Sequence, residues 1–220
     1  MYMVKDSNLY LVLSSEYTKG RPAADIAYQA IQAGIDILQV REKTFSRGNF
    51  LSYAKDIRSL CRKRSVTFIV NDDPVAAKRL DADGVHLGQE DIIKYPLPLT
   101  RGILGRDRII GISTHSVRQF LKAQEQDFDY IAFGPVFETK TKNYKIGTDG
   151  IGEVLSKSRK PVFFIGGINM SNIGTLASMG VKNIAVIRAI TEADDVALEV
   201  KRLKTAIISL KTGPNYADKN

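Results

Sequence analysis

Short apolar runs rich in β-branched residues recur along the chain at fairly regular intervals. Each run is continuously hydrophobic and does not alternate with polar positions, which is typical of parallel strands covered on both faces. The pattern therefore predicts eight buried parallel strands, at Leu9–Ser14, Ile37–Arg41, Thr67–Asn71, Gly84–Leu87, Ile109–Ile112, Tyr130–Phe133, Pro161–Ile165 and Asn183–Ile187.

The segments between these runs have the periodicity of amphipathic helices. In Ala23–Ala33 and Ser46–Arg64 the apolar residues recur every three or four positions, which is the spacing of one helix face. Cys61 falls on that face, so we expect it to pack in the core and to play no part in chemistry. Gly34 follows the first helix, where a left-handed terminating residue belongs. Prolines and glycines interrupt residues 92–108, where we expect a short or broken helix.

Strand and helix patterns combine into a repeating unit, in which a helix end and a glycine or aspartate precede a buried strand. The unit recurs at residues 33–38, 83–87, 127–133 and 179–186. Eight strands alternating with helices predict an α/β fold, a (β/α)8 TIM barrel forming a single domain over residues 1–210. We expect a flexible tail at 211–220. An open doubly wound sheet is the alternative, but Ser14-Ser15-Glu16 stands where a dinucleotide-binding sheet carries Gly-x-Gly-x-x-Gly.

Composition narrows the class of protein without identifying a function. The 220 residues are 44% hydrophobic and 25% charged, values that exclude a disordered chain. The single cysteine excludes a disulfide framework and a zinc site built from several thiolates. No apolar run reaches the roughly 18 residues of a membrane span, and the N-terminus lacks the features of a signal peptide. We therefore expect a cytoplasmic protein.

The net charge of +8 is compatible with two classes of partner. Clustered basic residues attract nucleic acid, but the tight basic cluster Arg62-Lys63-Arg64 has no interleaved aromatic residues. A positive field also attracts small anionic substrates, which we take as the better explanation. We expect neither a nucleic-acid nor a membrane partner and leave the oligomeric state open.

The polar residues that follow each strand are the candidates for chemistry, because active sites of such barrels lie at the carboxyl ends of the strands. After the second strand, alternation places Gln39, Arg41 and Lys43 on one side of the chain. Two cations beside an amide form a clamp for a phosphate or diphosphate. The alternative is a solvent-exposed run of charges.

Carboxylates follow the third and fourth strands. Asp73 precedes Pro74 and is expected to cap a helix, which leaves Asn71 and Asp72 without a structural task. Asp91 stands at the neighbouring strand end. Two carboxylates there repel each other unless a cation lies between them, and Mg²⁺ combines one or two carboxylates with waters and phosphate oxygens. Beside the cationic residues, this pair predicts a Mg²⁺–diphosphate site.

The fourth and fifth strands offer further polar groups. Ser113 is the better site candidate, because Ser116 is expected to cap the following helix. His115 is either an acid or base or a solvent-facing histidine. His86 lies inside a strand and is expected to be a core residue.

The long loop after the sixth strand carries Thr139, Thr141 and Lys142, side chains that suit an anion. The loop continues to Gly152, is long for a connection between a strand and a helix, and could close over the substrate as a lid.

The seventh and eighth strand ends suggest a second anion site. Gly166-Gly167 permits close approach of backbone to a ligand, and Arg188 follows the eighth strand. Loops at these two positions commonly bind a phosphate. One metal-assisted and one metal-free phosphate site fit two phosphorylated substrates that are joined with loss of diphosphate.

With these residues in place, the chain strongly resembles the thiamine phosphate synthase (thiamine-phosphate pyrophosphorylase) family. The matching segments run in order through about residues 9–205, and together they are highly specific. They are QVREK at 39–43, NDD at 71–73, ADGVHLGQED at 82–91, GISTHS at 111–116, GPVFETKTK at 134–142 and IGGI at 165–168.

The resemblance implies an enzyme that joins 4-amino-2-methyl-5-hydroxymethylpyrimidine diphosphate to 4-methyl-5-(2-phosphoethyl)thiazole, or its carboxylated form, giving thiamine phosphate and diphosphate. By position it implies Mg²⁺ ligands at Asp72 and Asp91. The pyrimidine diphosphate contacts that it implies are Gln39, Arg41, Lys43, Asn71, Ser113 and Lys142. The implied thiazole phosphate contacts are Thr139, Thr141, Gly167, Ile187 and Arg188.

In this family the diphosphate is thought to leave first, and the thiazole nitrogen then captures a pyrimidine-methyl carbocation. Mg²⁺ with Arg41, Lys43 and Lys142 would stabilise the charge that grows on the leaving diphosphate. Ser113 completes the set to which the resemblance gives catalytic roles. The mechanism needs no side-chain nucleophile, and none stands out.

Arg188 departs from the family pattern, which usually carries a serine at this corner. Its guanidinium would either grip the thiazole phosphate or fill its pocket. The alternative function is that of a thiazole tautomerase of the same barrel family, with His115 as acid or base and no diphosphate machinery. The joint presence of Asn71, Asp72, Asp91 and Lys142 favours the synthase.

Overall fold

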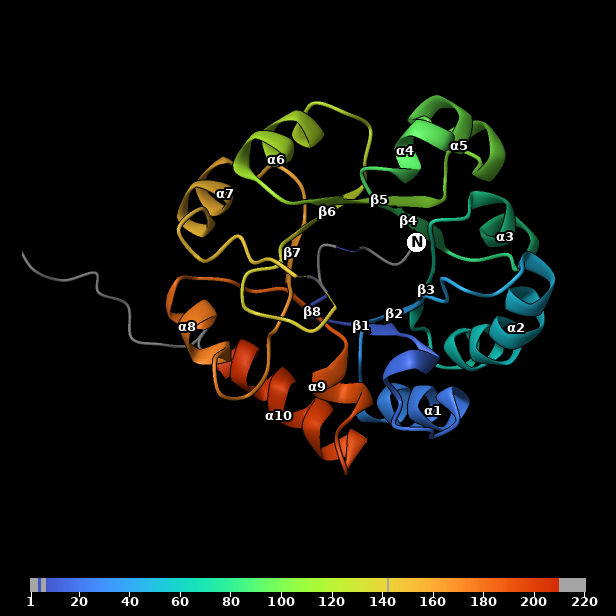
Figure 1. Cartoon of the computed structure of the whole chain (residues 1–220), viewed down its shortest axis with the longest axis horizontal. Coiled ribbons are helices and arrows are strands. Elements are labelled where there is room, and N and C mark those ends of the chain that lie inside the picture. The colour runs from blue at the N-terminus through green and yellow to red at the C-terminus, as the bar shows by residue number, and fades with distance from the viewer. Residues whose placement is uncertain (1–3, 5–6, 142, 210–220) are drawn as a thin grey trace, which may run out of the picture.

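In the computed structural model, which describes residues 4, 7–141 and 143–209, the chain forms a closed barrel of eight parallel strands ordered β1 to β8. Helices surround the barrel (Figure 1). The predicted (β/α)8 fold is confirmed, and the open doubly wound sheet is excluded. The predicted tail at 211–220 lies outside the described residues, as does Lys142.

The strands begin and end within two residues of the predicted apolar runs. The largest difference is at β5, which continues through the polar pair Ser113 and Thr114. The strands are β1 Leu9–Leu13, β2 Ile37–Val40, β3 Thr67–Asn71, β4 Gly84–Leu87, β5 Ile109–Thr114, β6 Tyr130–Phe133, β7 Val162–Ile165 and β8 Ile184–Val186.

The connecting helices vary in length, and the segment after β4 is broken into two short helices, as its prolines and glycines predict. None of the helices in the described part of the chain is long and apolar enough to cross a membrane. The helices are α1 Ala23–Ala33, α2 Arg47–Lys63, α3 Pro74–Arg79, α4 Asp91–Lys94, α5 Leu97–Leu104, α6 Val117–Gln124, α7 Ile151–Lys157, α8 Ile173–Ser178, α9 Arg188–Thr191 and α10 Val196–Ser209, with a 3-10 turn η2 at Ser15–Tyr17.

The predicted helix caps are in place. The Asp73 carboxylate accepts hydrogen bonds from the backbone N–H groups of Val75 and Ala76 at 2.9 and 3.0 Å. The Ser116 hydroxyl accepts one from the Gln119 N–H at 3.2 Å. These side chains satisfy N–H groups that a helix start leaves unpaired.

Two apolar clusters explain why the strands are hydrophobic without alternation. One fills the space between strands and helices and contains Leu9, Leu11 and Cys61, which is buried as predicted. The smaller one lies inside the barrel and contains Tyr10 and Val12 of the same strand. Successive side chains of a strand point to opposite faces, so both faces of β1 are buried and the sequence shows one apolar run.

Three aspartates that precede β2, β4 and β6 make one repeated contact at the amino ends of the strands. Each carboxylate accepts a backbone hydrogen bond from the start of the preceding strand, Asp36 from Leu9 at 2.9 Å, Asp83 from Phe68 at 2.8 Å and Asp129 from Ile110 at 2.7 Å. Each also pairs with a helix cation, Lys204, Arg58 and Arg101 respectively. These contacts give the aspartate of the repeating sequence unit a structural role.

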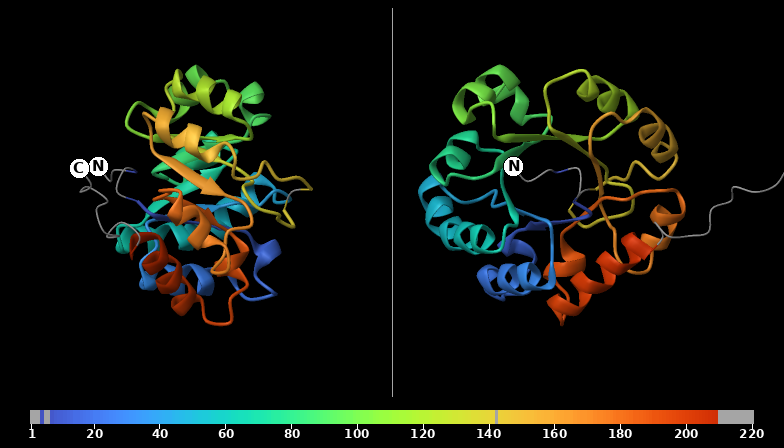
Figure 2. Two further views of the ribbon diagram at one scale, coloured as in Figure 1. Left: turned by 90° about the vertical axis from the view of Figure 1, so that its left-hand side faces the viewer. Right: turned by 180° about the vertical axis from the view of Figure 1, so that it is seen from behind.

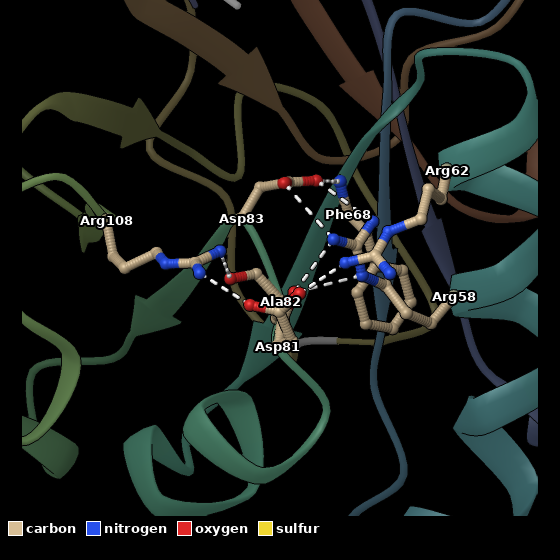
Figure 3. A network of polar contacts seen from close by, with 7 residues as sticks. All are labelled: Arg58, Arg62, Phe68, Asp81, Ala82, Asp83 and Arg108. Carbon is tan, nitrogen blue, oxygen red and sulfur yellow. Dashed lines mark hydrogen bonds and ion pairs between the residues drawn. The ribbon is translucent and has the colours of Figure 1, made fainter. Parts of the chain in front are cut away.

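The contacts around Asp83 form part of a larger polar network (Figure 3). Arg58 donates to the Asp81 carbonyl from Nε and Nη2 at 3.0 and 2.8 Å. Arg108 donates to the Ala82 carbonyl at 2.8 Å and also contacts the Asp81 carboxylate. The network joins α2 to the turns before β4 and β5 and so holds the amino end of the barrel together.

We expect Asp83→Ala to lower the free energy of unfolding by about 1–3 kcal/mol, because a buried backbone N–H loses its acceptor. The N–H belongs to Phe68, which is fully buried. The matched control is Asp127→Ala, because the Asp127 side chain is 80% exposed in its pair with Arg101. That change should cost less than about 1 kcal/mol. Equal losses in urea unfolding would contradict an anchoring role for Asp83.

Candidate active site at the carboxyl ends of the strands

Two adjoining cavities lie at the carboxyl ends of the strands. The first, here the central cavity, has a volume of about 320 Å³ and is lined from β1 to β8. The second, here the acidic cavity, has a volume of about 390 Å³ and is lined by Asp72, Asp73 and Asp91 together with Lys43. Asn71 lines both cavities, so they share a wall at the end of β3.

The structure brings together the described residues that the sequence and the resemblance single out. Lys43, Asp72 and Asp91 line the acidic cavity. The others line the central cavity: Gln39, Arg41, Asn71, Ser113, Thr139, Thr141, Gly167, Ile187 and Arg188.

The end of β2 is tied to the turn that follows β1. The Glu42 carboxylate accepts hydrogen bonds from the backbone N–H and the hydroxyl of Ser15 at 2.6 and 2.8 Å. Glu42 lies between Arg41 and Lys43 in the sequence, so this contact fixes the backbone that carries both cations. Gln39 is buried below them and donates from Nε2 to the Tyr10 hydroxyl at 2.6 Å.

Asp72 has a backbone conformation that non-glycine residues rarely adopt. Its φ is 62°, in the left-handed region, which costs a residue with a Cβ about 1–2 kcal/mol. Its N–H donates to the His86 carbonyl at 2.8 Å. The N–H of the next residue, Asp73, donates to the Asn71 carbonyl at 2.8 Å. The β3 and β4 ends thus hold a strained residue in the acidic cavity, and such strain is typical of functional positions.

The carboxylates of Asp72 and Asp91 lie within hydrogen-bonding reach of each other. Burial raises the pKa of Asp72 to about 7, and the neighbouring Asp91 adds to the rise, while Lys43 and Arg41 oppose it. One oxygen of Asp91 also accepts the Gly88 N–H at 2.9 Å. Two carboxylates this close favour either a shared proton or a cation between them.

The donors of the acidic cavity fit a hard divalent cation that keeps part of its water shell. Among the described residues, no group of three or more histidine, cysteine or acidic side chains is placed to hold a metal. Asp72 and Asp91 could therefore supply two oxygen ligands, with waters or phosphate oxygens completing the shell, which is a common arrangement for Mg²⁺.

Ser113 is positioned from two sides. Gln89 donates to its carbonyl at 2.6 Å, and its hydroxyl lies 2.8 Å from Nε2 of His86. His86 is buried as expected, but it also lines the central cavity, a role that sequence reasoning missed. Burial lowers the pKa of His86 to about 4, so its ring is neutral at physiological pH.

His115 also lines the central cavity and is half-buried. Its Nδ1 lies 2.6 Å from the Gly134 carbonyl. A carbonyl only accepts hydrogen bonds, so Nδ1 carries a proton and donates it to Gly134. His115 therefore lies at the cavity with its ring orientation fixed by a backbone carbonyl, and its role as acid or base stays a prediction.

The loop after β6 packs closely on the end of β7. The hydroxyls of Thr139 and Thr141 lie 2.7 Å apart. Gly167 has a φ of 67°, and a Cβ at this position would come within 2.2 Å of the Glu138 carbonyl oxygen, so only glycine fits there. Figure 2 (left) shows the loop, in yellow, projecting beyond the strand ends. Both threonines and the glycine pair line the central cavity.

Arg188 begins α9 and is held by a second charged residue. Its Nε and Nη2 donate to the two carboxylate oxygens of Glu192 at 2.7 and 3.0 Å, and the guanidinium lies 5.7 Å from the Tyr17 ring centroid. The hydrogen bond to Arg188 holds the pKa of Glu192 below its usual value. Since a guanidinium has five N–H groups, others remain to bind an anion.

Tyr10 also lines the central cavity, and the sequence contains a feature that could have identified it. It is 1% exposed and stands in an otherwise aliphatic strand. A buried tyrosine hydroxyl needs a partner, so a lone tyrosine in such a strand marks a polar contact inside the barrel.

The closed parallel barrel, with polar residues from distant segments gathered at its carboxyl rim, defines a (β/α)8-barrel enzyme. A family model described as thiamine monophosphate synthase matches residues 9–190. The chain therefore belongs to the thiamine monophosphate synthase family and is a transferase. This membership favours small anionic substrates over nucleic acid as the explanation of the positive charge.

Individual relatives support the same placement. The chain is 38% identical over 198 residues to the thiamine-phosphate synthase of Clostridium botulinum (strain Loch Maree / Type A3), covering 89% of this chain and 95% of that protein. It is 38% identical over 201 residues to that of Persephonella marina, covering 90% and 95%. The solved thiamine phosphate pyrophosphorylase from Pyrococcus furiosus superposes with a TM-score of 0.83 at 30% identity, covering 94% and 98%.

We expect Asp72→Asn to stabilise the metal-free protein at pH 8 by roughly 1–2 kcal/mol, less than the full pKa shift implies because solvent reaches the site. The folded-state pKa of Asp72, about 7, lies above its ordinary value of 3.8. The wild type therefore loses stability as pH rises from about 4 to 7. The gain from Asn should be complete above pH 7 and disappear below about pH 4.

Urea unfolding in EDTA across this pH range measures the effect, with Asp56→Asn on the exposed side of α2 as the control. A stability difference that does not change with pH would contradict the assigned pKa.

Proposed function

We propose that the protein condenses the pyrimidine diphosphate with the thiazole phosphate or its carboxylated form, releasing thiamine phosphate and diphosphate. The observation that carries this proposal is the adjoining pair of cavities. One contains a carboxylate pair beside Lys43, the other is lined by Gly167 after β7 and Arg188 after β8, and Asn71 lines both. Two phosphorylated substrates could thus lie side by side. A cytoplasmic location remains a prediction.

In the proposed reaction the pyrimidine C–O bond breaks first, and its electron pair leaves with the diphosphate. The thiazole nitrogen then supplies the pair that forms the new C–N bond. Arg41 and Lys43 would bind the departing diphosphate, since fixed cations stabilise charge that develops in a transition state. Lys142, outside the described residues, is proposed to assist them. Ser113 and Gln39 would orient the pyrimidine from the floor of the central cavity.

Asp72 and Asp91 would hold Mg²⁺ in the acidic cavity. When bound, the metal supplies positive charge that favours the departure of diphosphate. The chain's own contribution is to orient the carboxylates through the left-handed backbone of Asp72 and the Gly88 N–H on Asp91.

The thiazole phosphate is proposed to lie between the loop after β6 and the corner at β8. Thr139 and Thr141 supply hydroxyls, and Gly167 allows close approach of the backbone. Arg188 supplies charge, and its pair with Glu192 fixes the guanidinium at the cavity wall. We favour a grip on the phosphate over filling of the pocket, because the Glu192 contact holds the side chain against the wall.

The thiazole tautomerase function remains the second candidate, on the observation that His115 lines the central cavity and is oriented there by the bond from Nδ1 to the Gly134 carbonyl. This function would need His115 but not the carboxylates of Asp72 and Asp91.

We expect the protein to form thiamine phosphate from both phosphorylated substrates in Mg²⁺ and to lose this activity in excess EDTA. Asp72→Asn and Asp91→Asn should each lower kcat by about 100-fold or more, because each removes a metal ligand and transition-state charge stabilisation. Asp56→Asn, on the exposed side of α2, is the control. Undiminished product in EDTA would exclude the metal assignment.

If no product forms under either condition, isomerisation of the carboxythiazole phosphate should be measured for the wild type and His115→Asn. Loss of isomerisation in His115→Asn would then establish the tautomerase.

We expect Arg188→Ala to raise the KM for the thiazole phosphate about tenfold, the scale of one hydrogen bond to a charged group. The KM for the pyrimidine diphosphate should not change, because Arg188 lines the central cavity and not the acidic one. Arg159→Ala is the control, since that side chain is 62% exposed and precedes β7 at the other end of the barrel. A lower KM in Arg188→Ala would show that the side chain fills the pocket.

A further inference from the structure

A chain of hydrogen bonds crosses the barrel interior beneath the central cavity. It joins side chains from five strands, which are named here in order along the chain of contacts. Gln39 Nε2 lies 2.6 Å from the Tyr10 hydroxyl, which lies 2.9 Å from the Tyr130 hydroxyl. The Tyr130 hydroxyl lies 2.9 Å from His86 Nδ1, and His86 Nε2 lies 2.8 Å from the Ser113 hydroxyl.

Tyr130 is the middle member of this chain and is placed differently from the other four. It is fully buried, and it is not among the residues that line the central cavity, whereas Gln39, Tyr10, His86 and Ser113 are. Substrate in the cavity would therefore touch the ends of the chain and not its centre.

The ring of Tyr130 is tightly fixed. It lies over Gly111, where a Cβ would come within 2.1 Å of the ring. It packs edge-to-face on Phe163 at 5.6 Å and stacks on the His86 ring at 5.5 Å. Since the ring has no room to turn away, its hydroxyl is held between Tyr10 and His86.

The direction of the hydrogen bonds follows from the donor at the Gln39 end. Nε2 of Gln39 only donates, so Tyr10 accepts from it. Tyr10 is almost fully buried and needs an acceptor for its own proton, which the Tyr130 hydroxyl supplies. Tyr130 then donates to His86 Nδ1.

At the far end of the chain, Nδ1 of His86 accepts from Tyr130, so the ring carries its proton on Nε2 and donates it to the Ser113 hydroxyl. The proton of Ser113 is left to donate elsewhere. In the reverse direction the Tyr10 proton would be buried without an acceptor, which is costly.

We propose that Tyr130 is a positioning residue, which holds His86 in the Nε2–H tautomer so that the Ser113 hydroxyl donates its proton to an acceptor atom of the substrate. The identity of that substrate as the pyrimidine diphosphate rests on the proposed function. The tautomer of His86 does not.

Nitrogen NMR of the full chain tests the tautomer directly, without substrate. The chain contains two histidines, so the variant His115→Asn assigns the spectrum. In the wild type we expect His86 protonated at Nε2 and His115 protonated at Nδ1, as its contact with the Gly134 carbonyl requires. A wild-type His86 protonated at Nδ1 or at both nitrogens would overturn the proposal, whatever the variants do.

In Tyr130→Phe, His86 Nδ1 loses its donor, and the two tautomers should become mixed, with the nitrogen resonances moving toward each other. Tyr10→Phe is the matched control. It removes one buried hydroxyl from the same chain but leaves the Tyr130 contact with His86, so the Nε2–H tautomer should persist. An unchanged tautomer in Tyr130→Phe would overturn the proposal.

Kinetics test whether Tyr130 acts through Ser113. Tyr130→Phe should lower kcat/KM for the pyrimidine diphosphate about tenfold, the effect of one hydrogen bond, and leave the KM of the thiazole phosphate unchanged. In a double-mutant cycle, Tyr130→Phe combined with Ser113→Ala should be no slower than Ser113→Ala alone. Additive losses would overturn the proposal. If the synthase reaction itself is absent, the tautomer measurement decides the proposal alone.

Discussion

Closure of the parallel ladder between β8 and β1 is the constraint on which the site depends. Leu9 pairs with Ile184 and Tyr10 with Ala185, so the last strand lies beside the first. Because all strands run the same way, their carboxyl ends meet at one rim, and Gln39 and Arg188 line one cavity although they are far apart in sequence. In an open sheet, β1 and β8 would lie on opposite edges and the two proposed phosphate sites would be separated. The aspartates before β2, β4 and β6 support closure from the other end.

The side chains inside the barrel pack against one another and also orient Ser113 at the site. Its apolar cluster is small and contains the rings of Tyr10, Tyr130 and Phe163 beside aliphatic side chains, and Tyr10 and Phe163 meet edge-to-face at 5.3 Å. The tyrosine hydroxyls in this cluster hydrogen-bond to each other, so each has a partner although it is buried. These bonds also favour one arrangement of the side chains over others. A purely aliphatic interior would pack as well but would give Ser113 no partner below the cavity. The floor of the barrel is thus both core and support for the site.

The sequence predicted the strands well because burial on both faces leaves a signal that does not depend on distant partners. It also placed the described site candidates at the cavities, because the rule that active sites lie at strand ends needs only the strand boundaries. The sequence could not predict contacts between side chains that lie across the barrel from each other. The hydroxyls of Tyr10 and Tyr130 meet across 120 positions, and Glu192 holds Arg188 through a helix of four residues. Ser113 and Thr114 looked like loop because they are polar, yet Thr114 donates to the Ala132 carbonyl at 3.0 Å inside β5.

The two proposed phosphate sites balance their charges in opposite ways. At β8 a cation is already neutralised by Glu192, so an arriving phosphate competes with a carboxylate for a guanidinium that is held in place. At β3 and β4 the unfavourable pair is two carboxylates, one of them in a strained backbone, and the proposed Mg²⁺ would balance their charge. A site built this way is least stable when empty, and that local cost is tolerable because the core and the aspartate contacts stabilise the barrel independently. Under the proposed function, binding of the diphosphate would depend on the charge of Mg²⁺ as well as on Arg41 and Lys43, whereas the thiazole phosphate would need only groups that the chain carries itself.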